Sequence, residues 1–315
     1  MSKYRNNLPQ LSEELFITDG GLETTLLFHD GYELPEFAAF DLLTQPGGYE
    51  TLQNYYRSYI ILARANEVGF ILESPTWRAS RKWGDKLGYS SGDLREINRK
   101  SIALLQDLRD IWESGKTDVV ISGCIGPRGD GYNVSEKMTA EDARKYHLEQ
   151  IETLSETQAD LVSAFTINYT EEAVGISQAA EAAGIPAVIS FTVGTDGRLP
   201  SGQPLGEAVT TVDQATGNGP AYYMINCAHP SHFKGALNNE EPWLKRIRGI
   251  RANASAKSHA ELDAAVDLDE GDPTDLGARY AELKNQWRHF NIFGGCCGTD
   301  HRHVEEICKA VMSTN

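Results

Sequence analysis

The sequence predicts an α/β protein built as a single (β/α)8 (TIM) barrel. Short apolar runs rich in β-branched residues recur along the whole chain, and segments of helical periodicity separate them. Eight such strand–helix units favour a closed barrel over an open, doubly wound sheet. The length of 315 residues suits this fold, since barrels typically take about 250 residues and often carry insertions.

The elements follow one another as strand and helix throughout the chain. The predicted strands are 15–18, 69–72, 118–122, 161–165, 187–191, 222–225, 249–252 and 291–293. The predicted helices are 49–68, 91–113, 139–158, 171–183, 206–215 and 300–311, with two more before the last strand. Boundary residues agree with this order, because Thr139 with Asp142 is typical of a capping box and Gly184 before Pro186 is typical of a helix end.

Residues 1–315 are predicted to form one domain, because no interdomain linker interrupts them. The largest departure from the repeat is an insertion at about 255–289, between the last two strands. Its acidic stretch, which runs from Asp263 to Asp272 and precedes Pro273, is expected to be a solvated helix end and loop. A hydrophobic fraction of 40% and a charged fraction of 23% indicate a globular chain with a large core.

Composition also narrows the partners. The chain has 29 Lys and Arg against 45 Asp and Glu, and the resulting net charge of −16 repels phosphate backbones and anionic lipids. We therefore expect neither nucleic acid nor a membrane as a partner. Neither a signal peptide nor an apolar run of about 18 residues is present, so the expected location is cytoplasmic. A homo-oligomer is compatible with the sequence.

Polar residues and cysteines collect at the predicted strand ends, where barrel enzymes carry their reactive groups. In chain order they are Asp19-Gly20-Gly21, Glu73, Thr76, Gly126-Pro127, Asn226-Cys227, Asn253 and Gly294-Gly295-Cys296-Cys297-Gly298-Thr299. Because the carboxyl ends of parallel strands all lie at the same rim of a barrel, we expect these residues to lie close together. Neither G-x-G-x-x-G after a strand nor G-x-x-x-x-G-K-[ST] occurs, so dinucleotide and P-loop sites have no support.

The cysteines predict a metal site. Cys227 follows the sixth strand, and Cys296 and Cys297 follow the eighth, with a single strand between them in a closed barrel. Three thiolates suit Zn²⁺, and three protein ligands with an open fourth position are the pattern of a catalytic zinc.

Other interpretations of these residues remain open. Cys296 and Cys297 could instead form a buried pair or a vicinal disulfide. Cys124 and Cys308 are expected to be small buried residues outside the site. Four histidines near the cysteines are weaker ligand candidates, since surface hydrogen bonding is commoner at loops and helix starts. They are His229, His232, His301 and His303.

These motifs resemble the homocysteine S-methyltransferase family from about Phe16 to Ala310. The resemblance is carried by Asp19-Gly20-Gly21-Leu22-Glu23-Thr24, Gly123-Cys124-Ile125-Gly126-Pro127, Ile225-Asn226-Cys227 and Gly294-Gly295-Cys296-Cys297-Gly298-Thr299. The separated Asn-Cys and GGCCGT motifs are together highly specific, whereas either DGG or a lone CC would be weak.

The resemblance implies a (β/α)8 barrel with catalytic zinc on Cys227, Cys296 and Cys297, and homocysteine as the methyl acceptor. It also implies that Asp19 and the Gly20 backbone hold the polar end of the amino acid, although Asp19 also suits a turn. Asn226 is expected either to position Cys227 or to serve the turn. Zinc suits this chemistry. Only a thiolate is a good nucleophile, and a free thiol, with a pKa of about 8.5, is mostly protonated at neutral pH, so binding of the substrate sulfur to zinc would deprotonate it.

Two positions depart from the family pattern. Many members carry a Glu at the end of the fourth strand that binds the substrate amino group, and Phe165 occupies that position here. Either Asp19, Glu73 or Thr166 compensates, or the acceptor is a different small thiol without an ammonium group there. The betaine-using branch has a Tyr where this chain has Arg78, which makes betaine a less attractive donor.

The sequence thus predicts zinc-dependent methyl transfer from S-methylmethionine or S-adenosylmethionine to homocysteine, giving methionine. A zinc hydrolase or lyase is a weaker alternative, because it would need His and carboxylate ligands. A non-catalytic thiol-binding protein is a third.

Overall fold

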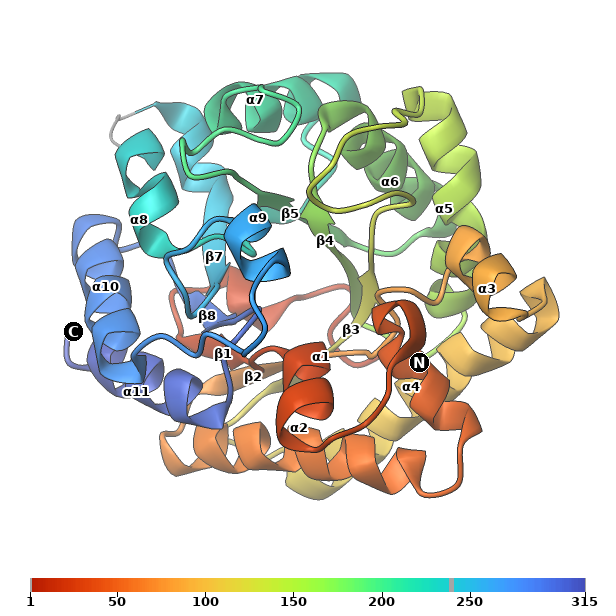
Figure 1. Cartoon of the computed structure of the whole chain (residues 1–315), viewed down its shortest axis with the longest axis horizontal. Coiled ribbons are helices and arrows are strands. Elements are labelled where there is room, and N and C mark those ends of the chain that lie inside the picture. The colour runs from red at the N-terminus through yellow and green to blue at the C-terminus, as the bar shows by residue number, and fades with distance from the viewer. Residues whose placement is uncertain (1, 238–240, 315) are drawn as a thin grey trace.

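The strands form a closed parallel barrel in sequence order (Figure 1). This computed structural model describes residues 2–237 and 241–314. The strands are β1 (Phe16–Thr18), β2 (Gly69–Glu73), β3 (Val119–Ile125), β4 (Leu161–Ile167), β5 (Ala187–Thr192), β6 (Tyr222–Asn226), β7 (Ile247–Ala252) and β8 (Ile292–Gly295). Pairing of β1 with β8, with Phe16 opposite Ile292, closes the ring. The predicted single (β/α)8 barrel is confirmed.

Helices form a ring around the strands in Figure 1. The α-helices are α1 (Leu22–Thr24), α2 (Gly48–Ala65), α3 (Arg81–Leu87), α4 (Ser91–Trp112), α5 (Ala140–Ser155), α6 (Thr170–Ala183), α7 (Leu205–Thr216), α8 (Pro230–Phe233), α9 (His259–Asp263), α10 (Pro273–Gln286) and α11 (His301–Met312). The sequence did not predict α3, because a helix of 7 residues is too short to show a clear period. Within the described residues, no helix is both long and apolar enough to span a membrane.

Local signals explain where two helices begin and end. Thr139 caps α5 by accepting a hydrogen bond from the Asp142 N–H, as predicted. The Asp142 carboxylate accepts from the Thr139 hydroxyl at 2.7 Å and not from its backbone N–H, so the second bond of the predicted capping box does not form. Gly184 ends α6 with a φ of +67°, the left-handed conformation that glycine adopts readily, which confirms the helix end that the sequence predicts there.

Six strands end later than predicted, three of them by two residues or more, and each of these three extensions carries residues toward the rim. β3 continues to Ile125, β4 to Ile167 and β8 to Gly295. In the sequence, polar residues and glycines are typical of strand ends. In the structure these residues continue the strands, because pairing with a neighbouring strand satisfies their backbone groups, and Cys124 paired with Ser163 is an example. Between Ala164 and Ile167 the register of β4 against β5 shifts, which places Thr166 at a φ of +63°.

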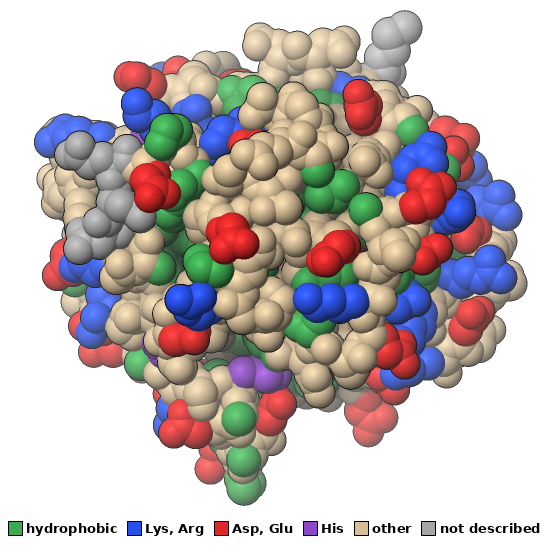
Figure 2. Space-filling view, turned by 90° about the horizontal axis from the view of Figure 1, so that it is seen from above, with side chains coloured by type: hydrophobic (Ala, Val, Ile, Leu, Met, Phe, Trp, Pro, Cys, Tyr) green, Lys and Arg blue, Asp and Glu red, His purple; other side chains and the backbone are tan. Residues whose placement is uncertain are grey.

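The barrel interior is a packed core beneath the rim. Its buried residues come from alternating strand positions, since successive side chains of a strand point to opposite faces. They include Phe16, Ile71, Val120, Leu161, Val188, Tyr222, Met224 and Ile292. A second, larger cluster fills the space between strands and helices. On the outer surface, Figure 2 shows acidic and basic side chains interspersed over one side of the molecule.

The segment 255–289 contains α9 and α10. Ser255 and Lys257 both contact the Asp269 carboxylate, at 2.9 Å each, which ties the α9 loop to the chain that precedes α10. Within the predicted acidic stretch, Asp263 and Asp272 are exposed, as expected of a solvated loop. α10 packs against α11 on the outside of the barrel.

Candidate active site

The structure brings Cys227, Cys296 and Cys297 together at the carboxyl rim of the barrel. Their three sulfur atoms lie within 4.8 Å of one another. Cys227 directly follows β6 and has a φ of +53°, while Cys296 and Cys297 directly follow β8. The convergence that the sequence predicts for these thiols is therefore present.

The end of β7 fixes the backbone of all three cysteines. The Arg251 carbonyl accepts from the Cys227 N–H at 3.1 Å, and the Ala252 carbonyl accepts from the Cys296 N–H at 2.8 Å. The Asn253 side-chain oxygen accepts from the Cys297 N–H at 3.1 Å. Because β7 lies between β6 and β8, one strand end holds both cysteine segments in register.

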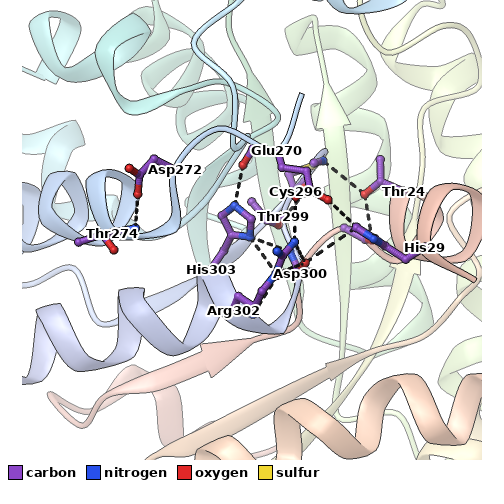
Figure 3. Close-up of polar contacts among 12 residues, drawn as sticks. Thr24, His29, Glu270, Asp272, Thr274, Cys296, Thr299, Asp300, Arg302 and His303 are labelled. Carbon is purple, nitrogen blue, oxygen red and sulfur yellow. Dashed lines mark hydrogen bonds and ion pairs between the residues drawn. The ribbon is translucent and has the colours of Figure 1, made fainter. Parts of the chain in front are cut away.

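Contacts within the turn after β8 and from the segment after β1 hold this turn in place (Figure 3). The Thr299 hydroxyl donates to the Cys296 carbonyl at 2.7 Å, and Thr24 accepts from the Gly298 N–H at 3.3 Å. A Cβ on Gly20 would lie 2.9 Å from the Thr299 carbonyl, so the glycines of the first motif allow the β1 and β8 loops to touch through their backbones.

The chemistry of the three sulfurs fits a thiophilic metal such as zinc. Cys227 and Cys296 are joined by a disulfide in this structure, with Cα atoms 5.5 Å apart, and the vicinal pairing of Cys296 with Cys297 is not formed. The reduced cysteines would offer three thiolates, the ligand type that zinc prefers. Burial raises the pKa of the Cys297 thiol to about 11, so a cation is needed to keep it ionised at neutral pH.

Asn226 and Thr166 surround the sulfurs. The Asn226 oxygen accepts from the Thr166 N–H at 3.0 Å and from Ser190 at 2.7 Å, while its amide nitrogen lies 4.0 Å from the Cys296 sulfur. The Thr166 hydroxyl lies 3.8 Å from the Cys227 sulfur. Both residues are therefore placed to orient the cysteines, and Asn226 also supports the strand end.

Arg251 is the main site residue that the sequence analysis did not identify. It is 8% exposed, donates to the carbonyls of Gly20 and Gly295 at 3.0 Å each, and lies 2.8 Å from the Asp19 carboxylate. Tyr55 also donates to Asp19, at 3.0 Å. Burial raises the pKa of Asp19 although the positive charge of Arg251 opposes the rise. An arginine near the end of a strand was the available signal, because a charge that becomes buried there needs a partner.

Glu73 is the predicted substrate-binding residue with a free oxygen. It is 5% exposed, lines the cavity above the barrel core, and its Oε2 has no hydrogen-bond partner among the described residues. Burial raises the pKa of Glu73 to about 7, and that of nearby Glu23 to about 7. A buried carboxylate without a partner is the kind of group that an ammonium ligand would satisfy.

We expect Glu73→Gln to stabilise the folded protein at alkaline pH and not at acidic pH. The folded state holds the Glu73 proton more tightly than the unfolded chain, so the wild type loses stability as pH rises from 4.5 through about 7. The variant should match the wild type near pH 4 and exceed its unfolding free energy by about 2–3 kcal/mol at pH 8. Urea unfolding at both pH values measures this. Exposed Glu181→Gln is the control, and a pH-independent difference for Glu73→Gln would contradict the expectation.

The remaining candidates lie outside the cysteine cluster. His229 caps α8, His232 contacts the Ala256 carbonyl, and His303 contacts Asp300. Cys308 is buried in α11, as predicted, whereas Cys124 lines the cavity, contrary to the expectation that it stays apart from the site. β3 extends to Ile125, and this extension places Cys124 within the rim.

A second group of possible metal ligands is already neutralised by an arginine (Figure 3). His29, Glu270 and Asp300 lie close together. Arg302 pairs with Glu270 at 3.0 Å and with Asp300 at 2.5 Å, so both carboxylates are engaged. We interpret this group as an ion-pair cluster that anchors α11 to the loop before α10.

A cavity of about 810 Å³ opens above the cysteines. Two loops meet over it, because Tyr132 of the β3–α5 loop stacks on His259 of α9 with ring centroids 3.3 Å apart. The Tyr132 hydroxyl lies 4.0 Å from the Cys297 sulfur. The fold and site together define a barrel protein with a three-cysteine cluster beneath a substrate-sized cavity.

Comparison with known proteins agrees with the family resemblance of the sequence motifs. Residues 16–311 match the profile of the homocysteine S-methyltransferase family. The chain is 22% identical to homocysteine S-methyltransferase 3 of Arabidopsis thaliana, over 94% of this chain and 89% of the relative. It is 23% identical to selenocysteine Se-methyltransferase of Brassica oleracea var. italica, over the same fractions.

Solved structures show the same fold. The homocysteine methyltransferase MmuM from Escherichia coli matches in its oxidised form with a TM-score of 0.75 at 17% identity, covering 97% of this chain and 99% of MmuM. Its metallated form matches with a TM-score of 0.71 at 19% identity, over 98% of this chain and 99% of MmuM. The chain belongs to the homocysteine S-methyltransferase family, and this confirms both the resemblance and the methyltransferase class.

Proposed function

We propose that this protein transfers a methyl group from a sulfonium donor to the thiol of homocysteine, giving methionine. The observation that supports this most strongly is the cluster of Cys227, Cys296 and Cys297 at the rim of a barrel of this family. In the reaction the acceptor sulfur supplies an electron pair to form a bond to the methyl carbon, while the bond between that carbon and the donor sulfur breaks and the donor sulfur keeps its electron pair. The donor becomes a neutral thioether, and the acceptor thiol proton passes to solvent.

We propose zinc as the metal, held by the three cysteines after reduction of the Cys227–Cys296 pair. When bound, zinc supplies the positive charge that keeps a substrate thiol ionised at neutral pH. Three protein ligands leave a fourth position for that thiol, as in catalytic zinc sites. The backbone contacts from β7 hold the cysteines in place before substrate binds, and we place the reaction in the cytoplasm.

The acceptor's ammonium group would bind near Asp19 and Glu73. Phe165 supplies no charge at the family's usual Glu position, and Arg251 already engages Asp19, so of the two carboxylates Glu73 is the one with an oxygen that has no partner among the described residues. The Gly20 carbonyl, held by Arg251, lies beside this region. A different small thiol or selenol as acceptor is the second candidate, favoured by the lost Glu and by the similarity to a selenocysteine methyltransferase.

The charge of the cavity supports a cationic donor. Carboxylate side chains outnumber Lys and Arg by ten to four among the residues that line it. A negative cavity attracts a sulfonium ion and, once the methyl is transferred, holds the neutral product less strongly. S-methylmethionine and S-adenosylmethionine both carry such a sulfonium group.

The test is elemental analysis of the reduced protein, paired with mass-spectrometric detection of methionine after incubation with homocysteine and either donor. We expect about one zinc per chain, for three thiolate ligands, and methionine formed with at least one donor. Zinc without methionine would overturn homocysteine as the acceptor. A protein that forms methionine after its metal is removed would overturn the zinc mechanism.

A further inference from the structure

Arg78 is held between two tryptophan rings at the wall of the cavity. Its guanidinium carbon lies 3.9 Å from the ring centroid of Trp77 and 3.5 Å from that of Trp83. Both indoles are fixed in turn, since Trp77 donates to the Phe165 carbonyl at 3.3 Å and Trp83 to the Pro127 carbonyl at 3.2 Å. With both faces covered, the donors that remain for a ligand lie along the edge of the guanidinium plane.

These donors are largely unused. Arg78 is only 7% exposed, yet over residues 2–237 and 241–314 it has no carboxylate within ion-pair distance. Its Nε is buried without a partner in the described part of the chain, and Nη1 donates one long hydrogen bond, 3.4 Å, to the Gly129 carbonyl. Burial lowers the pKa of Arg78 to about 10, so the side chain stays positive at neutral pH. A buried, unpaired charge costs stability, and a ligand that pairs with it would remove that cost.

The other cations that line the cavity are already paired. Arg251 is engaged by Asp19 and by the two backbone carbonyls of the β1 and β8 loops. Lys82 lies 3.3 Å from Glu136, and Lys86 lies 3.3 Å from Glu36. Arg78 is thus the cavity cation with donors available for a planar anion, and carboxylates match a guanidinium edge.

The place of Arg78 in the barrel indicates which substrate it contacts. It follows β2, and its two tryptophans pack against the ends of β3 and β4, whereas the cysteines follow β6 and β8 on the opposite side of the ring. The acceptor sulfur belongs at the cysteines, and a methyl transferred in line must arrive from the side facing away from them. The acceptor's amino-acid end is placed at Asp19 and Glu73, at the ends of β1 and β2, whereas Arg78 lies further along the loop after β2, against Trp83 and Gly129. A carboxylate held by Arg78 is therefore assigned to the donor.

We propose, resting on the function proposed above, that Arg78 binds the carboxylate of the methyl donor and so selects amino-acid sulfonium donors over sulfonium ions without that group. The Trp77 and Trp83 rings hold the guanidinium in the orientation that a carboxylate needs. This assigns Arg78 a specificity role for the donor.

The test compares Arg78→Met with the wild type on two donors, S-methylmethionine and its decarboxylated analogue, dimethyl(3-aminopropyl)sulfonium. Loss of a charge-assisted hydrogen-bonded pair should raise the KM for S-methylmethionine about 10- to 100-fold. The KM for homocysteine, and the KM of the variant for the carboxylate-free donor, should stay near the wild-type values. Arg78→Lys keeps the positive charge but lacks the planar guanidinium group, so its KM for S-methylmethionine should lie between those of the wild type and Arg78→Met. Arg81→Gln, an exposed cation at the start of α3 outside the cavity lining, is the matched control.

Wild-type enzyme alone gives a second readout that does not depend on the variant folding. It should prefer S-methylmethionine over the decarboxylated donor by about the same 10- to 100-fold in KM. Equal KM values for the two donors, or a change confined to the homocysteine KM in Arg78→Met, would overturn the proposal. Wild-type enzyme inactive with every sulfonium donor would instead overturn the proposed function.

Discussion

Cys296→Ser is expected to lose the metal and the methyl transfer together. Apparent zinc-binding energies of about 10–16 kcal/mol, shared among the ligands, imply that one thiolate contributes roughly 3–4 kcal/mol, or a factor of about 10²–10³ in affinity. The measurement is zinc content after dialysis of reduced protein, followed by initial rates of methionine formation. Because a thiol without a nearby cation is mostly protonated at neutral pH, the rate should fall in parallel with the metal content.

Cys308→Ala is the matched control for this experiment. Cys308 is buried in α11 beside Met312, and it is absent from the cysteine cluster. Its replacement removes one thiol and leaves all three sulfurs of the site, so metal content and rate should be unchanged. A Cys296→Ser protein that retains its metal, or that turns over at the wild-type rate after metal removal, would contradict the ligand assignment.

Arg251→Met is expected to destabilise the protein by about 3–5 kcal/mol, because it leaves the Asp19 carboxylate buried without its charge partner. Asp19 is 3% exposed, and without Arg251 the Tyr55 hydroxyl is the one side-chain donor to its carboxylate among the residues that the structure describes. The carbonyls of Gly20 and Gly295 lose a donor at the same time. Urea unfolding at pH 8 measures the loss in unfolding free energy.

The pH dependence of the destabilisation by Arg251→Met, and a second substitution, distinguish the loss of a charge partner from a packing defect. Removing Arg251 takes away the charge that opposes the raised pKa of Asp19, so this pKa should rise further and the destabilisation should shrink as the pH falls and Asp19 takes up a proton. The double variant Asp19→Asn with Arg251→Met removes both charges and should recover part of the loss. A loss that is equal at pH 5 and pH 8 and is not relieved in the double variant would indicate a packing defect instead.

Much of the fold could be predicted from the sequence. The strands are buried on both faces, so each appears in the sequence as a short apolar run, and turn glycines and caps such as Gly184 and Thr139 mark the helix boundaries. The predicted strands ended too early where functional residues begin, because Gly123 and Cys124 do not look like strand residues. Their backbone groups are nevertheless satisfied by the neighbouring strand.

The cysteine site was also predictable, since Cys227, Cys296 and Cys297 stand at strand ends and the closed topology alone brings those ends together. What the sequence could not supply was which charges meet around it. Arg251 and Asp19 are 232 residues apart, and Arg78 contacts Trp83 of its own segment and Gly129 of the loop after β3. The sequence by itself thus determined the barrel and which three cysteines converge at its rim, because local periodicity and strand-end position encode both. Only the tertiary structure decided which buried charges are paired and which are left for a substrate, because pairing depends on contacts between distant strands.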